Sequence, residues 1–138
     1  MRLSVPARFL DLCSEMGEKE QQDDGGSMQR WLEVRGKVQN VMFRQTLIRA
    51  MQRRGLEGGA TNDRRDKQLV RVTLRGDTER IEELVAALRR GTPINDWGAK
   101  ASSVEDVEAT RGLALEAHQV TTATVDNHRW NPNVTMFL

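Results

Sequence analysis

Apolar and polar residues alternate along several short segments of this chain, whereas two longer segments repeat their apolar residues every three or four positions. Strict alternation is typical of a strand with one buried face, and the longer repeat is typical of an amphipathic helix. The pattern predicts strands at 31–38, 56–61, 68–74, 104–108 and 119–125, and helices at 43–54 and between Asp77 and Gly91. The apolar spacing at 104–108 fits a strand least well.

Both predicted helices carry end signals. Gly55 follows the first helix and Gly91 follows the second, and glycine is the residue that most often ends a helix. Asp77 or Thr78 can cap the start of the second helix by accepting a hydrogen bond from a free N–H group. These signals set where each predicted helix begins or ends, between the strands on either side of it.

The elements follow one another in the order β-α-β-β-α-β, with one added strand. Two helices on one face of a mostly antiparallel sheet bury both amphipathic stripes at once. The expected fold class is therefore α+β, a ferredoxin-like sandwich of βαββαβ topology. The last residues, 133–138, also look strand-like, and the pattern leaves open whether they pair with the sheet.

The beginning of the chain has a different composition. Residues 17–27 are polar and charged, so they bury too little apolar area to offset the cost of ordering them. We expect residues 1–28 to be a disordered segment or extension, 29–126 to form the domain, and 127–138 to form a C-terminal extension. A targeting peptide at residues 1–13 is an alternative, but the acidic residues that follow argue against it.

Charge and cysteine content narrow the functional classes. The net charge is +1, which argues against nucleic-acid binding through bulk charge and leaves local basic patches possible. The single cysteine, Cys13, excludes a disulfide within the chain and suits a reducing compartment, so we expect a cytoplasmic protein. No run of eighteen apolar residues occurs, and we expect no membrane association.

The turn between the first predicted strand and the first predicted helix carries candidate chemistry. Backbone N–H groups of such a turn and of the helix start point at one spot, which makes an anion cradle. Arg44 lies in the first helical turn, and a guanidinium suits bidentate recognition of phosphate. Asn40 fits a nest-like turn because asparagine tolerates the left-handed region better than most residues.

This turn and a later segment resemble two motifs of the acylphosphatase family. Residues 36–44 (GKVQNVMFR) match the family's G-x-V-Q-G-V-x-F-R, with Asn40 in place of the second glycine. Residues 55–62 (GLEGGATN) resemble G-L-x-G-W-V-x-N, with Gly59 in place of tryptophan and Ala60 in place of valine. The resemblance extends from about residue 30 to 125, although the hairpin loop at 63–67 is longer than is usual in the family.

The resemblance implies an enzyme that hydrolyses carboxyl-phosphate bonds. The phosphoryl group would be bound by Arg44 and by backbone N–H groups of Gln39, Asn40, Val41, Met42 and Phe43. Asn62 would orient the attacking water. A small-molecule acyl phosphate is the implied substrate and inorganic phosphate a product, with no metal, no cofactor and a monomeric protein. In keeping with this, His118 and His128 lie outside the motifs and no metal-ligand spacing occurs.

Two other interpretations stay open at this point. Asn40, Gly59 and the longer hairpin would suit a binding module that keeps the anion cradle and has lost efficient turnover. A ferredoxin-like RNA-binding domain would instead need aromatic residues on its central strands for base stacking. The predicted strand at 68–74 has none, which counts against RNA binding.

Overall fold

The computed structural model describes residues 26–138, so the predictions about Cys13 and the first residues lie outside the described part of the chain. Residues 29–76 and 80–138 form one compact unit, which the following paragraphs concern. No helix in the described part of the chain is long and apolar enough to cross a bilayer.

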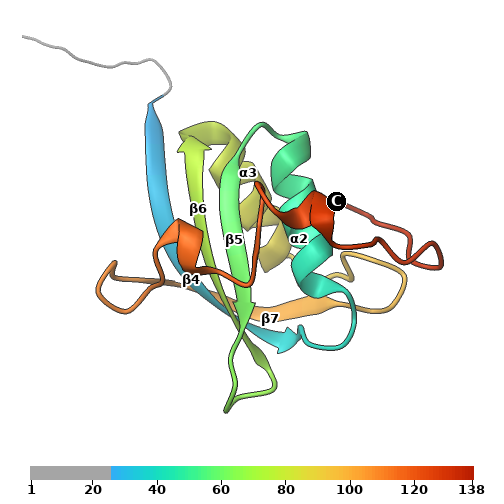
Figure 1. Ribbon diagram of the computed structural model, residues 1–138. Helices are drawn as coiled ribbons and strands as arrows, with labels where there is room; N and C mark the ends of the chain where they lie inside the picture. Colours follow the sequence, from blue (N-terminus) through green and yellow to red (C-terminus); the bar gives the residue numbers. More distant parts are fainter. Residues whose placement is uncertain (1–25) are drawn as a thin grey trace, which may run out of the picture. The chain divides into compact units, whose positions relative to one another are not determined.

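A five-stranded sheet with the strand order β7-β4-β6-β5-β8 is the centre of this unit. Its strands are β4 (Ser27–Lys37), β5 (Glu57–Asn62), β6 (Leu69–Asp77), β7 (Lys100–Val107) and β8 (Val120–Thr121). The α-helices of the described region are α2 (Phe43–Arg53) and α3 (Thr78–Arg89), and they lie together on one face of the sheet (Figure 1). Short 3-10 helices follow at Leu115–Ala117 and Val125–Asn127. The predicted α+β ferredoxin-like fold with an added strand is confirmed.

The core lies between the helices and the sheet. Leu47 and Met51 of α2 and Leu84 of α3 are fully buried against this face. Burial of each such side chain contributes about 1.5–3 kcal/mol. A side chain at Gly58 of β5 would collide with the Met51 sulfur, so glycine lets α2 approach the sheet closely.

The predicted helix ends are confirmed by the backbone. α2 ends at Arg53, and Gly55 has a φ of 69°. α3 ends at Arg89, and Gly91 has a φ of 72°. Both glycines adopt the left-handed conformation that ends a helix at little cost. The loop at residues 38–42, which carries the candidate chemistry, therefore leads into a helix, α2, whose two ends are well defined.

The predicted bounds of three strands were wrong. The strand expected at 119–125 ends at Thr121 because the Thr121 hydroxyl accepts hydrogen bonds from the N–H groups of Ala123 and Thr124, both at 3.2 Å. Such side-chain bonds compete with the strand ladder and turn the chain. The strand expected at 68–74 continues as β6 to Asp77, and α3 begins at the next residue. β7 also begins at Lys100, before the predicted start.

The end of the chain packs back onto the unit. Met136 forms an isolated antiparallel bridge with Asn95, and the N–H of Phe137 donates to the carbonyl of Ile94 at 2.9 Å. The Trp130 ring lies 5.4 Å from the guanidinium carbon of Arg49 on α2. The division into residues 1–28, 29–126 and 127–138 stays a prediction.

Candidate active site

In the loop between β4 and α2, residues with a positive φ alternate with residues that do not have one. Asn40 has a φ of 64° and Met42 a φ of 60°, whereas Val41 between them does not have a positive φ. Alternation of this kind forms a nest in which successive N–H groups converge on one point. Among residues 26–138, the N–H groups of Gln39 to Phe43 have no hydrogen-bond acceptor. The loop therefore offers several free donors to an anion.

The conformation expected of Asn40 is confirmed, and that of Met42 was not foreseen. A left-handed residue other than glycine costs roughly 1 kcal/mol, somewhat less for asparagine. Met42 also precedes the first residue of α2, and its side chain makes no capping hydrogen bond. Strain of this kind is typical of ligand-binding loops, where the surrounding structure holds it in place.

A buried amide holds the loop from behind. Asn95 is fully buried, and its Nδ2 donates to the carbonyl of Val41 at 2.9 Å and to Oγ1 of Thr46 at 3.0 Å. The Thr46 hydroxyl in turn donates to the carbonyl of Met42 at 2.7 Å. The carbonyls of Val41 and Met42 are therefore held by the protein, whereas the loop N–H groups have no acceptor within it.

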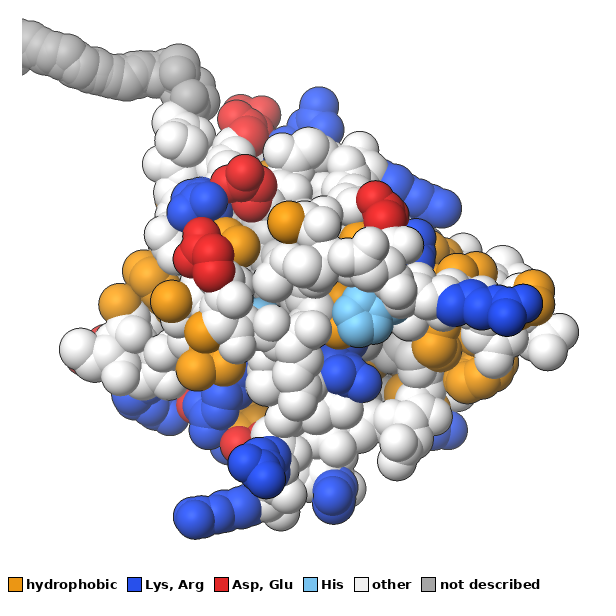
Figure 2. Space-filling view, in the orientation of Figure 1, with side chains coloured by type: hydrophobic (Ala, Val, Ile, Leu, Met, Phe, Trp, Pro, Cys, Tyr) orange, Lys and Arg blue, Asp and Glu red, His pale blue; other side chains and the backbone are white. Residues whose placement is uncertain are grey.

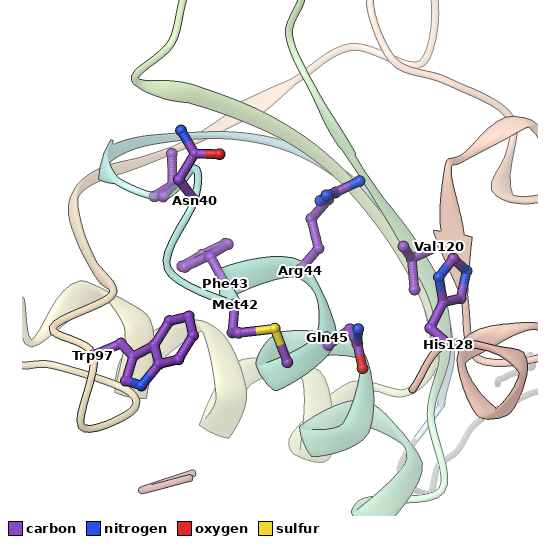
Figure 3. Close-up of a pocket in the computed structure, with 9 residues that line it drawn as sticks. Asn40, Met42, Phe43, Arg44, Gln45, Trp97, Val120 and His128 are labelled. Atoms are coloured by element: carbon purple, nitrogen blue, oxygen red, sulfur yellow. The ribbon is translucent and has the colours of Figure 1, made fainter. Parts of the chain in front are cut away.

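Arg44 extends from the first turn of α2 into this site. Figure 3 shows its side chain between Asn40 on one side and Val120 and His128 on the other. Its Nη1 donates to Oε1 of Gln119 at 2.7 Å. Burial lowers the pKa of Arg44 from its usual value, but a guanidinium stays charged at neutral pH. No carboxylate in the described part of the chain pairs with Arg44, so this half-buried cation lacks a counter-charge.

Asn62 ends β5 beside Arg44. Its backbone N–H donates to the same Gln119 Oε1 at 3.0 Å. Its own side-chain oxygen, Oδ1, is buried and has no hydrogen-bond partner. A buried acceptor without a donor is rare in native proteins and indicates a place for a water molecule or ligand group. The two residues implied in catalysis are thus brought together around one amide oxygen.

The Gln39 side chain has a role that the sequence did not indicate. Its Nε2 lies 3.2, 3.1 and 3.0 Å from the carbonyl oxygens of Asp63, Asp66 and Leu69. These carbonyls belong to the hairpin between β5 and β6, which directly follows Asn62. Gln39 therefore ties the nest to the strand end that carries Asn62.

A cavity of about 350 Å³ opens beside the nest (Figure 3). It is lined by Val38, Asn40, Met42, Phe43, Arg44, Gln45, Trp97, Val120 and His128. Of the predicted site residues, Gln39, Val41 and Asn62 are not part of this lining. Met42, Trp97 and Val120 add apolar surface to a lining that also holds the charge of Arg44, which suits a ligand with an anionic end and an apolar end.

Several residues of the site were missed because they come from distant segments. Val120 reaches the cavity because β8 pairs with the edge of β5, where Ala60 lies opposite Val120. Gln119, just before β8, reaches Arg44 through its side chain, and His128 lines the cavity from the segment after the second 3-10 helix. Asn95 and Trp97 come from the loop after α3. The segments that contain these residues carry no recognisable motif, so no local sequence signal indicated that the residues belong to the site.

Gly59 has a structural explanation here. A Cβ atom at Gly59 would lie 2.6 Å from the Cβ of His118, so His118 takes the space above this strand position. The His118 ring lies between two hydroxyls, with Nδ1 3.0 Å from Thr61 Oγ1 and Nε2 2.7 Å from Thr73 Oγ1. The lack of a side chain at Gly59 therefore leaves room for the buried side chain of His118. Within residues 26–138, no group of three or more His, Cys, Asp or Glu residues could hold a metal ion.

The fold and the loop together define a ferredoxin-like α+β domain with a nest of free backbone N–H groups. The acylphosphatase family model matches residues 31–114. An acylphosphatase of Rhizorhabdus wittichii is 34% identical over 87 residues, which cover 63% of this chain and 81% of that protein. The chain therefore belongs to the acylphosphatase family of hydrolases.

Solved structures of the same family are also similar. The crystal structure of acylphosphatase from Bacillus subtilis is 29% identical, with a TM-score of 0.48 over 65% of this chain and 90% of that one. The structure of an acylphosphatase from Coxiella burnetii is 26% identical, with a TM-score of 0.49 over 59% of this chain and 82% of that one.

Proposed function

We propose that this protein hydrolyses small acyl phosphates to a carboxylate and inorganic phosphate. The observation that carries the proposal is the shared acceptor: Gln119 Oε1 bonds both to Arg44 Nη1 and to the backbone N–H of Asn62. Arg44, a cation without a counter-charge, therefore lies close to the end of β5, which carries the unpartnered amide oxygen of Asn62. Membership of the acylphosphatase family supports the same activity.

In the proposed complex the phosphoryl oxygens accept hydrogen bonds from the N–H groups of residues 39–43 and from the Arg44 guanidinium. These donors are charged or fixed by the fold, so they need little reorganisation when the substrate binds. The acyl group would lie in the cavity, against the apolar surface that includes Met42 and Trp97. This arrangement leaves the far side of the phosphorus open to water.

Asn62 would hold that water through its unpartnered Oδ1. The water attacks phosphorus, the bond from phosphorus to the acyl oxygen breaks, and the carboxylate leaves with the electron pair. A carboxylate is a good leaving group, so little general-acid help is required. Positioning and charge stabilisation can supply most of the rate enhancement. The mechanism uses no metal ion and no covalent intermediate.

Hydrolysis of benzoyl phosphate in the presence of EDTA tests this proposal. We expect turnover that EDTA leaves unchanged. Asn62→Ala should remove turnover while phosphate still raises the melting temperature, whereas Arg44→Ala should remove phosphate binding as well. Asn133→Ala, at an exposed position near the C-terminus, is the matched control. Turnover by Asn62→Ala at the parental rate would contradict the water-orienting role.

A second candidate function is an anion-binding module with weak turnover, because the nest formed by the left-handed Asn40 and Met42 would bind an anion whether or not hydrolysis follows. Absence of benzoyl phosphate hydrolysis, combined with thermal stabilisation by phosphate, would support that function instead. The monomeric state and the cytoplasmic location stay predictions from the sequence.

A further inference from the structure

The lysines of this protein are concentrated around one hollow. The chain has four lysines, and three of them, Lys37, Lys67 and Lys100, lie in the described region. All three line a single shallow hollow of about 490 Å³. The remaining lining residues are Gly36, Val38, Gln39, Asn40, Gln68 and Ser102, and none of them is acidic.

The charges of this lysine hollow are not compensated by the protein. In the region from residue 26 onward, none of the three lysines makes an ion pair or a side-chain hydrogen bond. Eight arginines of the same region do form ion pairs with carboxylates. Asp66, which precedes Lys67 in the chain, forms its ion pair with Arg35, whose Nη1 lies 2.6 Å from Asp66 Oδ2. An anion from outside would therefore find three free ammonium groups.

Two of these lysines lie opposite each other on neighbouring strands of the sheet. Lys37 on β4 and Lys100 on β7 are directly opposite in the strand register. Like charges in directly opposite positions destabilise a sheet. A bound anion between the two ammonium groups would offset this repulsion, so the pair is suited to an anionic ligand.

The lysine hollow adjoins the candidate active site. Val38 and Asn40 line both the hollow and the cavity that contains Arg44. The Lys37 ammonium also lies beside Gly98, since a Cβ atom there would be 3.4 Å from Nζ. Gly98 follows Trp97, which lines the cavity. Figure 2 shows Lys and Arg side chains gathered at the lower end of the visible face, around the hairpin between β5 and β6.

Because the two sites share Val38 and Asn40 as lining residues, we infer that the lysine hollow is a second anion subsite, which binds a carboxylate or phosphate group carried by the acyl part of the substrate. The inference rests on the proposed function, because it assigns the phosphoryl group to the nest and the second anionic group to the lysines. Ammonium groups act as compact point charges without strict geometry, which suits a terminal anion on a flexible chain. The protein would thus select acyl phosphates with an anionic tail over neutral ones.

The sharpest test compares two substrates with the same number of carbon atoms. Succinyl phosphate ends in a carboxylate, and butyryl phosphate ends in a methyl group. We expect the parent protein to have the higher kcat/KM for succinyl phosphate at low salt, with an advantage that shrinks as salt is added. 3-Phosphonopropionyl phosphate has a phosphonate in place of the carboxylate. Its kcat/KM, compared with that of succinyl phosphate, distinguishes a preference for phosphate-like dianions from a preference for carboxylates.

The double variant Lys37→Gln, Lys100→Gln should lower kcat/KM for succinyl phosphate about tenfold, through KM, which corresponds to about 1.4 kcal/mol. Its kcat/KM for butyryl phosphate should stay within about twofold of the parent. Lys67→Gln alone should have a smaller effect in the same direction. Arg53→Gln, at the far end of α2 from the nest, removes one positive charge as the control.

The outcomes separate the inference from the proposed function. Equal losses for both substrates in the double variant, or no loss for either, would overturn the anion subsite while leaving the hydrolase in place. If the parent protein hydrolyses neither substrate, the proposed function itself fails. A selective loss for the two substrates with anionic tails supports both.

Discussion

The side-chain oxygen of Gln119 accepts a 2.7 Å hydrogen bond from Arg44, although the two residues are 75 positions apart in the chain. The backbone N–H of Gln119 donates at 2.9 Å to Oγ1 of Thr61, the strand residue that precedes Asn62. Gln119 is therefore fixed at the edge of β5 before its amide reaches the guanidinium. This places a neutral acceptor where a carboxylate would neutralise the cradle.

Changing the charge of Gln119 tests this role. Gln119→Glu would give Arg44 a permanent counter-charge, so we expect phosphate affinity to fall by tenfold or more. Gln119→Ala removes the acceptor without adding charge, and we expect a fall of only about threefold. Isothermal titration with phosphate measures both. Equal affinities for the Glu and Ala variants would show that the neutrality of Gln119 is not what keeps Arg44 available.

The contrast between Arg44 and Gln119 shows what the sequence could predict. Arg44, Asn40 and Asn62 stand in contiguous motifs beside elements whose periodicity is clear, so local pattern was enough to place them. Gln119 acquires its role only through the pairing of β8 with β5, which no local pattern encodes. The strand predicted around it was also too long, because β propensity does not register the side-chain bonds of Thr121 that end the strand.

Asn95 is predicted to be essential for the shape of the nest. Asn95→Ala would leave the carbonyl of Val41 and the N–H groups of Trp97 and Ala99 without their buried partner. Each unsatisfied buried group costs about 1–3 kcal/mol, so we expect a loss of about 3 kcal/mol in the free energy of unfolding. Urea denaturation measures the loss. Phosphate binding by the folded variant should weaken as well, and unchanged binding would contradict the supporting role.

Glu33 should be the most important carboxylate for stability in the described region. It is 4% exposed and lies 2.7 Å from Arg71 and 3.2 Å from Arg111. Only the Glu33 end of these ion pairs is buried: Arg111 is 62% exposed, and Arg71 also pairs with Asp63, so Glu33→Gln should destabilise the protein by about 1–2 kcal/mol. Its directly opposite neighbour on β7, Glu105, is exposed and provides the control. Glu105→Gln should change the free energy of unfolding by less than about 0.5 kcal/mol.

His118 makes the fold sensitive to mild acid. The Thr73 hydroxyl donates to the carbonyl of Leu113 at 2.7 Å, so it must accept a hydrogen bond from His118 Nε2–H. Nδ1 is then left to accept from the Thr61 hydroxyl, which itself accepts from the Gln119 N–H. A second proton on the ring would break this chain of donors. In agreement, burial lowers the pKa of His118 from 6.5 to about 4.

A lowered histidine pKa means that the unfolded chain takes up a proton before the folded protein does. The stabilisation from neutral His118 is therefore complete above about pH 6.5 and is lost as the pH falls toward about 4. We expect this loss to be about 2–3 kcal/mol. Urea denaturation at several pH values, with His118→Gln alongside, isolates the contribution because acidic residues affect both proteins alike. Parallel stability profiles for the two proteins between pH 6.5 and 4 would show that His118 does not remain neutral in the fold.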